Sequence, residues 1–333
     1  MNNYFPPFTI TNEMISLISS IMEKVGKVDS YSNLSKYPVL RKQNRIKSIH
    51  SSCAIEANSL SFEQVTSVIN GAKVIGPQKD IIEVQNAVDA YNQIEKVNPL
   101  EEGQIKTIHY LFGKNIIRDA GKYRTINEGV SDEQGNVVFV APPPSMVPSL
   151  MNNLFSWMNK ESNSINPLIL SSIFHYEFVF IHPFSDGNGR TARFWQNALL
   201  GKWKSIFYWL PIENQIHKYQ SEYYNAISKS HSDGNSNAFI VFMLGVIDKT
   251  FNELISDAKQ LDHSISIYLE KLLNVLKTGI WYTSNQILDS LDLKSKETLR
   301  KNYINPAVEN GLMILEFPDK PTSKNQRYKI IRK

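Results

Sequence analysis

Helical periodicity dominates the chain, and it is clear between residues 61 and 91. Ser61 is followed three residues later by Gln64, the capping-box pattern that begins a helix. We expect this helix to stop near Gly71 and a second helix to follow Pro77. Apolar residues recur in the second helix at three- and four-residue steps, which predicts one buried face: Ile81, Val84, Val88 and Tyr91.

The pattern changes to strand-favouring residues between Tyr123 and Val140. These residues are Thr125, Ile126, Val130, Val137, Val138, Phe139 and Val140. Polar turn residues at 131–136 separate the two runs, and three prolines at 142–144 follow the second run. We therefore predict a β-hairpin at this place in the chain.

Helices resume near Val147, and Pro167 is suited to the first turn of another helix. That helix is apolar on most sides, so it is predicted to be the central helix of a bundle. Its apolar positions are Leu168, Ile169, Ile173, Phe174, Phe178, Val179 and Ile181. A further helix is expected from Thr191 to about Trp203.

The chain from about residue 262 reads as a separate module. Helical patterns at 267–276, 284–291 and 296–310 are followed by strand patterns at 312–315 and 328–331. Three helices followed by a two-stranded wing is the winged helix-turn-helix pattern. The predicted fold class is therefore mainly α, with one hairpin and a terminal winged module.

Composition adds few constraints. The 333 residues can form two or three domains, and 42% hydrophobic with 20% charged residues is ordinary for a soluble globular protein. The single cysteine, Cys53, excludes an intrachain disulfide and a cysteine-based zinc cluster. Residues 1–10 do not resemble a signal peptide, and the longest apolar run, 239–247, is about half a membrane span. We expect a cytoplasmic protein without a membrane partner.

Charge is distributed unevenly along the chain. The net charge is +4, but residues 294–333 carry ten Lys/Arg and four Asp/Glu, a local excess of +6. The last forty residues are therefore a candidate surface for an acidic partner.

Residues 182–193 carry the most informative chemistry. Two glycines, Gly187 and Gly189, flank Asn188 and allow the backbone to adopt positive φ and turn its N–H groups toward one point. The helix that follows adds unpaired N–H groups and the positive end of its dipole. The segment is therefore predicted to be an anion site suited to phosphates.

Ionisable side chains flank this predicted anion site. Arg190 and Arg193 are three residues apart on a helix, so they can share a face and donate to phosphate oxygens. Asp186 precedes the site and can hold Mg²⁺ beside the phosphates. His182 is the residue here that can act as a base near neutral pH.

This stretch resembles the signature of the Fic (Fic/Doc) family, H-x-F-x-[DE]-G-N-G-R-x-x-R, with every fixed position matched. The resemblance implies a Fic-type helical bundle and a protein adenylyltransferase. Such an enzyme uses ATP and Mg²⁺ to transfer AMP to a Tyr, Thr or Ser hydroxyl of a target protein or of itself. The implied domains are a helical region at 1–100, a catalytic core at 101–250 and the winged module at 262–333.

The resemblance also implies a role for each residue of the motif. His182 deprotonates the target hydroxyl, Phe184 anchors the loop, and Asp186 coordinates Mg²⁺ between the α- and β-phosphates. The phosphates are cradled by Gly187, Asn188 and Gly189, with Arg190 at the β-phosphate and Arg193 at the γ-phosphate. Pyrophosphate leaves after in-line attack on the α-phosphorus.

Two further segments resemble parts of a Fic active site. The predicted hairpin, with Val137, Val138 and Phe139, corresponds to a flap that pairs with the backbone of the target. Tyr223 and Tyr224 correspond to a tyrosine pair that lines the adenine pocket. Two adjacent helical tyrosines are otherwise commonly half core and half surface, and His231 stands where the family often has asparagine.

An inhibitory motif of the family, [ST]-x-x-x-E-[GN], resembles the chain at Ser52 and Glu56. Ala57 departs from the family's glycine or asparagine, and Asn58 follows one place later. The resemblance implies that Glu56 pairs with Arg193 and occupies the place of the γ-phosphate. This N-terminal position of the motif is the arrangement called class II.

The winged module leaves alternatives open. Lys294, Lys296, Arg300 and Lys301 can contact DNA phosphates, yet winged helices also serve as protein-docking or dimer modules. Alternatives to the adenylyltransferase are a DNA-binding regulator whose Fic core senses nucleotide, or a Fic enzyme that uses another phosphate donor or removes AMP. A homo-oligomer is compatible with all of these readings.

Overall fold

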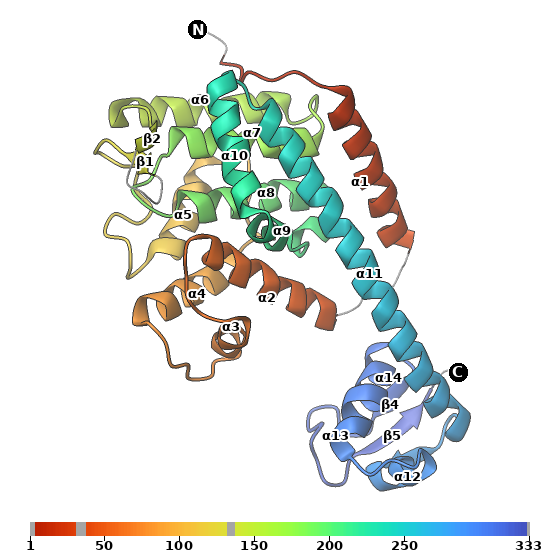
Figure 1. The fold of residues 1–333 in the computed structure, drawn as a ribbon. Coiled ribbons are helices and arrows are strands. Elements are labelled where there is room, and N and C mark those ends of the chain that lie inside the picture. The colour runs from red at the N-terminus through yellow and green to blue at the C-terminus, as the bar shows by residue number, and fades with distance from the viewer. Residues whose placement is uncertain (1–3, 31–37, 132–136, 332–333) are drawn as a thin grey trace. The chain divides into compact units, whose positions relative to one another are not determined.

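The computed structural model describes residues 4–30, 38–131 and 137–331 (Figure 1). The chain divides into two compact units, residues 1–252 and residues 253–333. The structure is mainly helical with few strands, as the sequence predicts. None of the helices in the described part of the chain is both long and apolar enough to cross a bilayer.

The first unit is a helical bundle with one hairpin. Its helices are α1 (Asn12–Ser30), α2 (Pro38–Ile55), α3 (Phe62–Ile69), α4 (Gln78–Tyr91), α5 (Glu102–Gly113), α6 (Val147–Glu161), α7 (Pro167–Ile181), α8 (Asn188–Trp203), α9 (Ile212–Lys218), α10 (Gln220–Asp233) and the first part of α11 (Asn237–Val275). Short 3₁₀ turns, η2 (Pro144–Met146) and η3 (Ser205–Tyr208), join some of them.

Local sequence signals for the helix starts are confirmed. Ser61 caps α3 and exchanges hydrogen bonds with Gln64 in a complete capping box. The helix after Pro77 is α4, and Pro167 lies in the first turn of α7 behind Asn166, whose side chain accepts from the Leu168 N–H. Most of α7 is buried, and it packs against α8, so the predicted central helix is also confirmed.

The start of α8 differs from the prediction. The helix begins at Asn188 rather than at Thr191, so Gly189 lies inside its first turn. Gly187 caps α8 with φ +78°, whereas Gly189 does not have a positive φ. The expectation that both glycines adopt positive φ is therefore wrong for Gly189, and its lack of a side chain has another reason, described below.

The hairpin is present but short. β1 (Gly129–Ser131) pairs antiparallel with β2 (Val137–Val140), and the register is irregular between Val130 and Ser131. Thr125 and Ile126, which the sequence assigned to the first strand, precede β1. The turn was predicted at residues 131–136: Ser131 belongs to β1 instead, and residues 132–136 lie outside the described residues.

The second unit has a three-stranded antiparallel sheet of order β3-β5-β4. Its elements are the end of α11, β3 (Trp281–Thr283), α12 (Ser284–Ser290), α13 (Lys296–Leu299), the π-helical turn η4 (Arg300–Ile304), α14 (Asn305–Glu309), β4 (Met313–Leu315) and β5 (Arg327–Ile330). The β4–β5 wing was predicted, but β3 was missed.

A single helix runs through the place near residue 262 where the sequence pattern predicted the start of a separate module. The helical pattern predicted at 267–276 is the end of α11, which begins at Asn237 and is 39 residues long. Residues 246–275 contain neither proline nor glycine, so no residue there ends the helix. Leu272 in the last turn of α11 and Leu276, which directly follows the helix, contribute to the hydrophobic core of the second unit.

Candidate active site

The loop between α7 and α8 brings the predicted catalytic histidine to a helix end. His182 ends α7 in the left-handed conformation, with φ 51° and ψ 58°, and its N–H donates to the carbonyl of Phe178. A non-glycine residue in this conformation costs on the order of 1 kcal/mol, which the surrounding contacts must offset. Strain of this kind is characteristic of functional sites.

Two side chains fix the loop that follows. Phe184 is fully buried and stacks on the ring of His109, with centroids 3.6 Å apart. The amide of Asn188 accepts from the Phe184 N–H at 3.0 Å and donates to the Phe184 carbonyl at 2.7 Å. Asn188 therefore braces the loop through its side chain.

His109, on α5, supports the same loop from the other side. Its Nε2 lies 2.8 Å from the carbonyl of Asp186, and its Nδ1 accepts from the Gly121 N–H at 2.8 Å. Burial lowers the pKa of His109, so the ring is neutral and can donate through one nitrogen and accept through the other. Sequence reasoning missed His109, because nothing adjacent in the sequence links it to the motif.

Arg124, in the segment that leads into the hairpin, connects the base of the hairpin to the loop at 182–193, a contact that the sequence did not reveal. Its Nε donates to the carbonyl of His182 at 2.7 Å, and its Nη1 donates to that of Ile126 at 2.9 Å. Its Nη2 donates to the carbonyls of Pro142 and Ile181. One buried guanidinium thus satisfies acceptors at the end of α7 and on both sides of the hairpin.

The electrostatic environment favours neutral His182. Burial lowers the pKa of its imidazole, and the charge of Arg124 acts in the same direction. A backbone hydrogen bond at Val179 and the charges of Glu56 and Asp186 act in the opposite direction, but the pKa of His182 is lowered on balance. A neutral imidazole can accept a proton at pH 7, which is what a general base requires.

Arg193 lies at the centre of the predicted inhibitory contact. Its Nη2 donates to Glu56 Oε1 at 2.7 Å and to the Ser52 carbonyl at 2.9 Å, while Nε donates to Ser52 Oγ at 3.2 Å. Burial opposes ionisation of Glu56, but Arg193 and Arg190 outweigh it, so the pKa of Glu56 is lowered. The structure thus brings Ser52 and Glu56 to the arginine predicted to bind the γ-phosphate.

The packing around the first turn of α8 leaves no room for a side chain at Gly189. A Cβ built on Gly189 would overlap Glu56 Oε1 and lie 3.0 Å from Arg193 Nη1. A carboxylate therefore lies directly against the first turn of α8, where N–H groups are unpaired. The Glu56 carboxylate therefore occupies the position that is suited to an anion.

Ala57 lies just after the end of α2 and has φ 63°. Glycine and asparagine adopt this conformation most readily, which gives a physical reason for the residue types in the resembled motif. Asn58 is anchored instead through its side chain, which donates to the Asp80 carbonyl at 3.1 Å and to Glu83 Oε2 at 2.7 Å.

Arg190 has a partner that the sequence did not reveal. It is buried and forms an ion pair with Glu83 of α4, and its Nη2 lies 3.5 Å from Asp186 Oδ1. Glu83 is itself buried in α4. The two arginines of the motif thus point to two different carboxylates, from α4 and from the end of α2.

Asp186 fits a Mg²⁺ site that is completed by substrate. Its side chain is 57% exposed, and Oδ1 accepts from the Gly187 N–H at 2.5 Å. In the described part of the chain, no group of three His, Cys, Asp or Glu side chains could hold a metal. Mg²⁺ commonly uses one or two carboxylates together with substrate phosphates and water, so a single exposed aspartate beside an anion site is sufficient.

The two tyrosines have different environments. Tyr223 is 2% exposed, and its hydroxyl hydrogen-bonds His175 at 2.9 Å. Tyr224 is 49% exposed. Of the pair, only Tyr224 offers an accessible ring face in this structure.

Phe139 of β2 packs on α10. Its ring stacks on His231 with centroids 4.3 Å apart, and it also contacts Phe180 of α7. The side chains of Val137 and Val138 lie outside the described residues, so only their place in β2 is known. The hairpin is thus joined to the bundle by an aromatic contact as well as by Arg124.

Comparison with known proteins assigns the chain to a family. Residues 99–200 match the Fic/DOC family model, and residues 268–331 match that of the filamentation induced by cAMP protein Fic-like, C-terminal domain. A Fic family protein from Desulfovibrio desulfuricans G20 has 37% identity and a TM-score of 0.74, over 99% of each chain. The chain belongs to the Fic family. A Fic domain containing signaling protein from Bacteroides thetaiotaomicron is 21% identical to this Fic chain and shares its fold, with a TM-score of 0.59. The match covers 75% of this chain and 97% of the Bacteroides chain.

Curated relatives of this Fic chain carry the name protein adenylyltransferase. The relative from Nematostella vectensis is 29% identical over 201 residues, which is 57% of this chain and 45% of the relative. The relative from Caenorhabditis elegans is 28% identical over 207 residues, 58% of this chain and 39% of the relative. The chain thus spans less than half the length of these relatives.

Proposed function

We propose that this Fic protein is a protein adenylyltransferase that moves AMP from ATP to a Tyr, Thr or Ser hydroxyl of a target protein or of itself. The observation that carries the proposal is the loop from His182 to Arg193. It places a neutral imidazole and a buried guanidinium on either side of a helix N-terminus suited to phosphates. The names of the curated relatives agree with this activity.

The reaction requires little covalent chemistry from the protein. The hydroxyl oxygen forms a bond to the α-phosphorus, the bond between that phosphorus and the bridging oxygen to the β-phosphate breaks, and pyrophosphate leaves. His182 accepts the hydroxyl proton. The N–H groups at the start of α8 and the guanidinium of Arg193 neutralise phosphate charge, so positioning and electrostatics supply most of the catalysis.

Asp186 is the residue that would hold Mg²⁺ when nucleotide is bound. The ion would neutralise charge on the phosphates and on the departing pyrophosphate. The carboxylate of Asp186 accepts a hydrogen bond from the Gly187 N–H, and 57% of the side chain is exposed, so an ion can reach it.

Autoinhibition by Glu56 is part of the proposal. Its carboxylate contacts Arg193 and lies against Gly189, which is where the γ-phosphate would be bound. A triphosphate must displace this carboxylate to bind productively, because two anions at one arginine repel each other. We assign this regulatory role to residues 1–100, catalysis to residues 101–250, and a separate role to the winged module at 262–333.

Intact-protein mass spectrometry tests the reaction. The Glu56→Gly protein is incubated with Mg²⁺ and an equimolar mixture of ATP, GTP, CTP and UTP, with the Glu56→Gly/His182→Ala protein as the control. We expect the mass of one or more AMP groups on the first protein and no addition on the second. Addition of another nucleotide, or equal labelling of both proteins, would contradict the proposal.

A further inference from the structure

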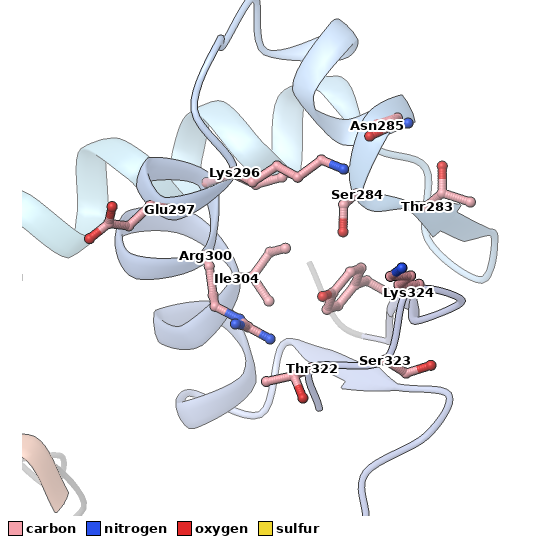
Figure 2. Close-up of a pocket in the computed structure, with 12 residues that line it drawn as sticks. Thr283, Ser284, Asn285, Lys296, Glu297, Arg300, Ile304, Thr322, Ser323 and Lys324 are labelled. Carbon is pink, nitrogen blue, oxygen red and sulfur yellow. The ribbon is translucent and has the colours of Figure 1, made fainter. Parts of the chain in front are cut away.

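A polar cavity of about 560 Å³ lies within the second unit (Figure 2). It is bounded by three segments: the start of α12, the helical segment from Lys296 to Ile304, and the β4–β5 loop at residues 322–324. Its base is apolar, formed by Leu299, Ile304 and Tyr328, which belong to the core of the unit. No step of the proposed transfer reaction uses it.

The cavity is lined by cations from two of these segments. Lys296 and Arg300 are four residues apart on one helical face, and Lys324 comes from the β4–β5 loop. In the described residues, none of the three forms an ion pair, and Glu297 is the sole carboxylate lining the cavity. Figure 2 shows the Glu297 carboxylate directed away from the cavity centre.

Neutral donors complete the lining. Ser284 and Asn285 of α12 lie on the side that Lys296 reaches, and Thr322 and Ser323 lie on the side of Arg300 (Figure 2). Arg300 Nη2 donates to the Pro321 carbonyl at 2.8 Å, which ties the β4–β5 loop to the helix. Guanidinium, ammonium, hydroxyl and amide groups together are the donors that contact phosphate oxygens in nucleic-acid complexes.

We propose that this cavity binds the phosphate backbone of B-form double-stranded DNA. The helical segment from Lys296 to Glu309 buries Leu299, Tyr303 and Ala307 and exposes Lys296, Arg300 and Asn305. An exposed polar helix face beside a β-ribbon is the shape that enters adjacent grooves of a duplex. The narrow major groove of A-form RNA does not admit a helix, so DNA is favoured over duplex RNA.

An extended polyanion fits this site better than a small anion. The cations are spread over a helix and a separate loop, and Lys294, Lys301 and Lys320 are exposed in the same part of the chain. Residues 294–333 carry an excess of six positive charges. A single small ion would not use charges distributed in this way, whereas successive phosphates along a strand would.

Fluorescence anisotropy of a labelled 30-base-pair random-sequence duplex tests the proposal on the full-length protein. The variant Lys296→Gln/Lys324→Gln removes two cavity charges and leaves the Arg300 contact that holds the loop. The control, Lys271→Gln/Lys277→Gln, removes two exposed lysines of the same unit that do not line the cavity. Thermal melting and ATP labelling of both variants show that the folded core is unchanged.

The dependence of duplex affinity on salt concentration gives the expected size of the effect. The three cavity cations alone predict a slope of about −2.7 in log K against log salt, hence at least about a 40-fold loss of affinity between 50 and 200 mM salt, and contacts by Lys294, Lys301 or Lys320 would make the slope steeper. The cavity variant lacks two contacts, so its slope should be shallower than that of the unmodified protein by about 1.8. The control should retain the slope of the unmodified protein.

Four results would overturn the assignment. They are no duplex binding in 50 mM salt, equal slopes for the two double variants, displacement of the duplex by ATP or pyrophosphate at matched phosphate concentration, and tighter binding of duplex RNA than of DNA. The third result would identify a small-anion pocket. None of them bears on the transfer reaction, which depends on the other unit.

Discussion

Replacing Glu56 with glycine removes the carboxylate that contacts Arg193 and leaves the anion site open. Glu56 lies just beyond the last residue of α2, so glycine there does not interrupt the helix. The Glu56 Oε1 to Arg193 Nη2 distance is 2.7 Å, and the Arg193 side chain is 1% exposed. The free energy of this contact is therefore little screened by solvent.

The size of the effect follows from that contact. A hydrogen bond to a charged group contributes about 1.5–3 kcal/mol. ATP must displace it to place its γ-phosphate at Arg193, and 1.36 kcal/mol corresponds to a tenfold change in rate. We therefore expect kcat/KM for self-labelling with ATP to rise about 10- to 150-fold in Glu56→Gly.

Initial rates with radiolabelled ATP and Mg²⁺, at several concentrations below KM, measure this change. Glu95→Gly is the matched control, because it removes an exposed carboxylate from a turn outside the site. Glu56→Gln should activate less than glycine does, since the amide still occupies the space beside Gly189. A Glu56→Gly rate within twofold of the unmodified protein, or an equal rise in the Glu95 control, would refute the reasoning.

Three other predictions concern the loop and its supports. The pKa of His182 is lowered from 6.5, so labelling by the Glu56→Gly protein should be constant down to pH 6.5 and fall only at lower pH, where the imidazole becomes protonated. The pKa of Glu56 is lowered from 4.5, so its carboxylate stays ionised and the brake of the unmodified protein should persist down to pH 4.5. A pH–rate series in which labelling by Glu56→Gly already falls above pH 6.5, or in which the unmodified protein becomes active as the pH is lowered from 6.5 to 4.5, would exclude these roles. Ala57→Gly should raise the free energy of unfolding by up to about 1 kcal/mol without activating the enzyme. Glycine relieves the strain of the left-handed conformation, and the larger conformational entropy of the unfolded chain offsets part of that gain. Arg124→Ala should lower Tm by roughly 6–12 °C, equivalent to about 3 kcal/mol for carbonyls left without a donor, and a Tm within 2 °C of the unmodified protein would contradict that structural role.

Much of the local structure could be read from the sequence because its causes are local. The α3 capping box, the apolar periodicity of α4 and the proline at the start of α7 depend on residues within a few positions of each other. Errors arose where one residue type serves several purposes. Gly189 looked like a turn residue, but it is a helical residue whose missing side chain makes room for Glu56.

The sequence by itself predicted the chemistry proposed for the loop at 182–193, since these twelve positions are contiguous and their residue types are those of a base, a metal ligand and anion donors. The tertiary structure decided most of the groups that surround that loop. The pairing of Glu56 with Arg193, 137 residues apart, was implied by the family resemblance and not by any local pattern, whereas the pairing of Glu83 with Arg190, 107 residues apart, was not anticipated. His109 and Arg124 brace the loop from α5 and from the base of the hairpin. Contacts at such separations are set by how the helices pack, and no local pattern encodes the partner of a buried charge.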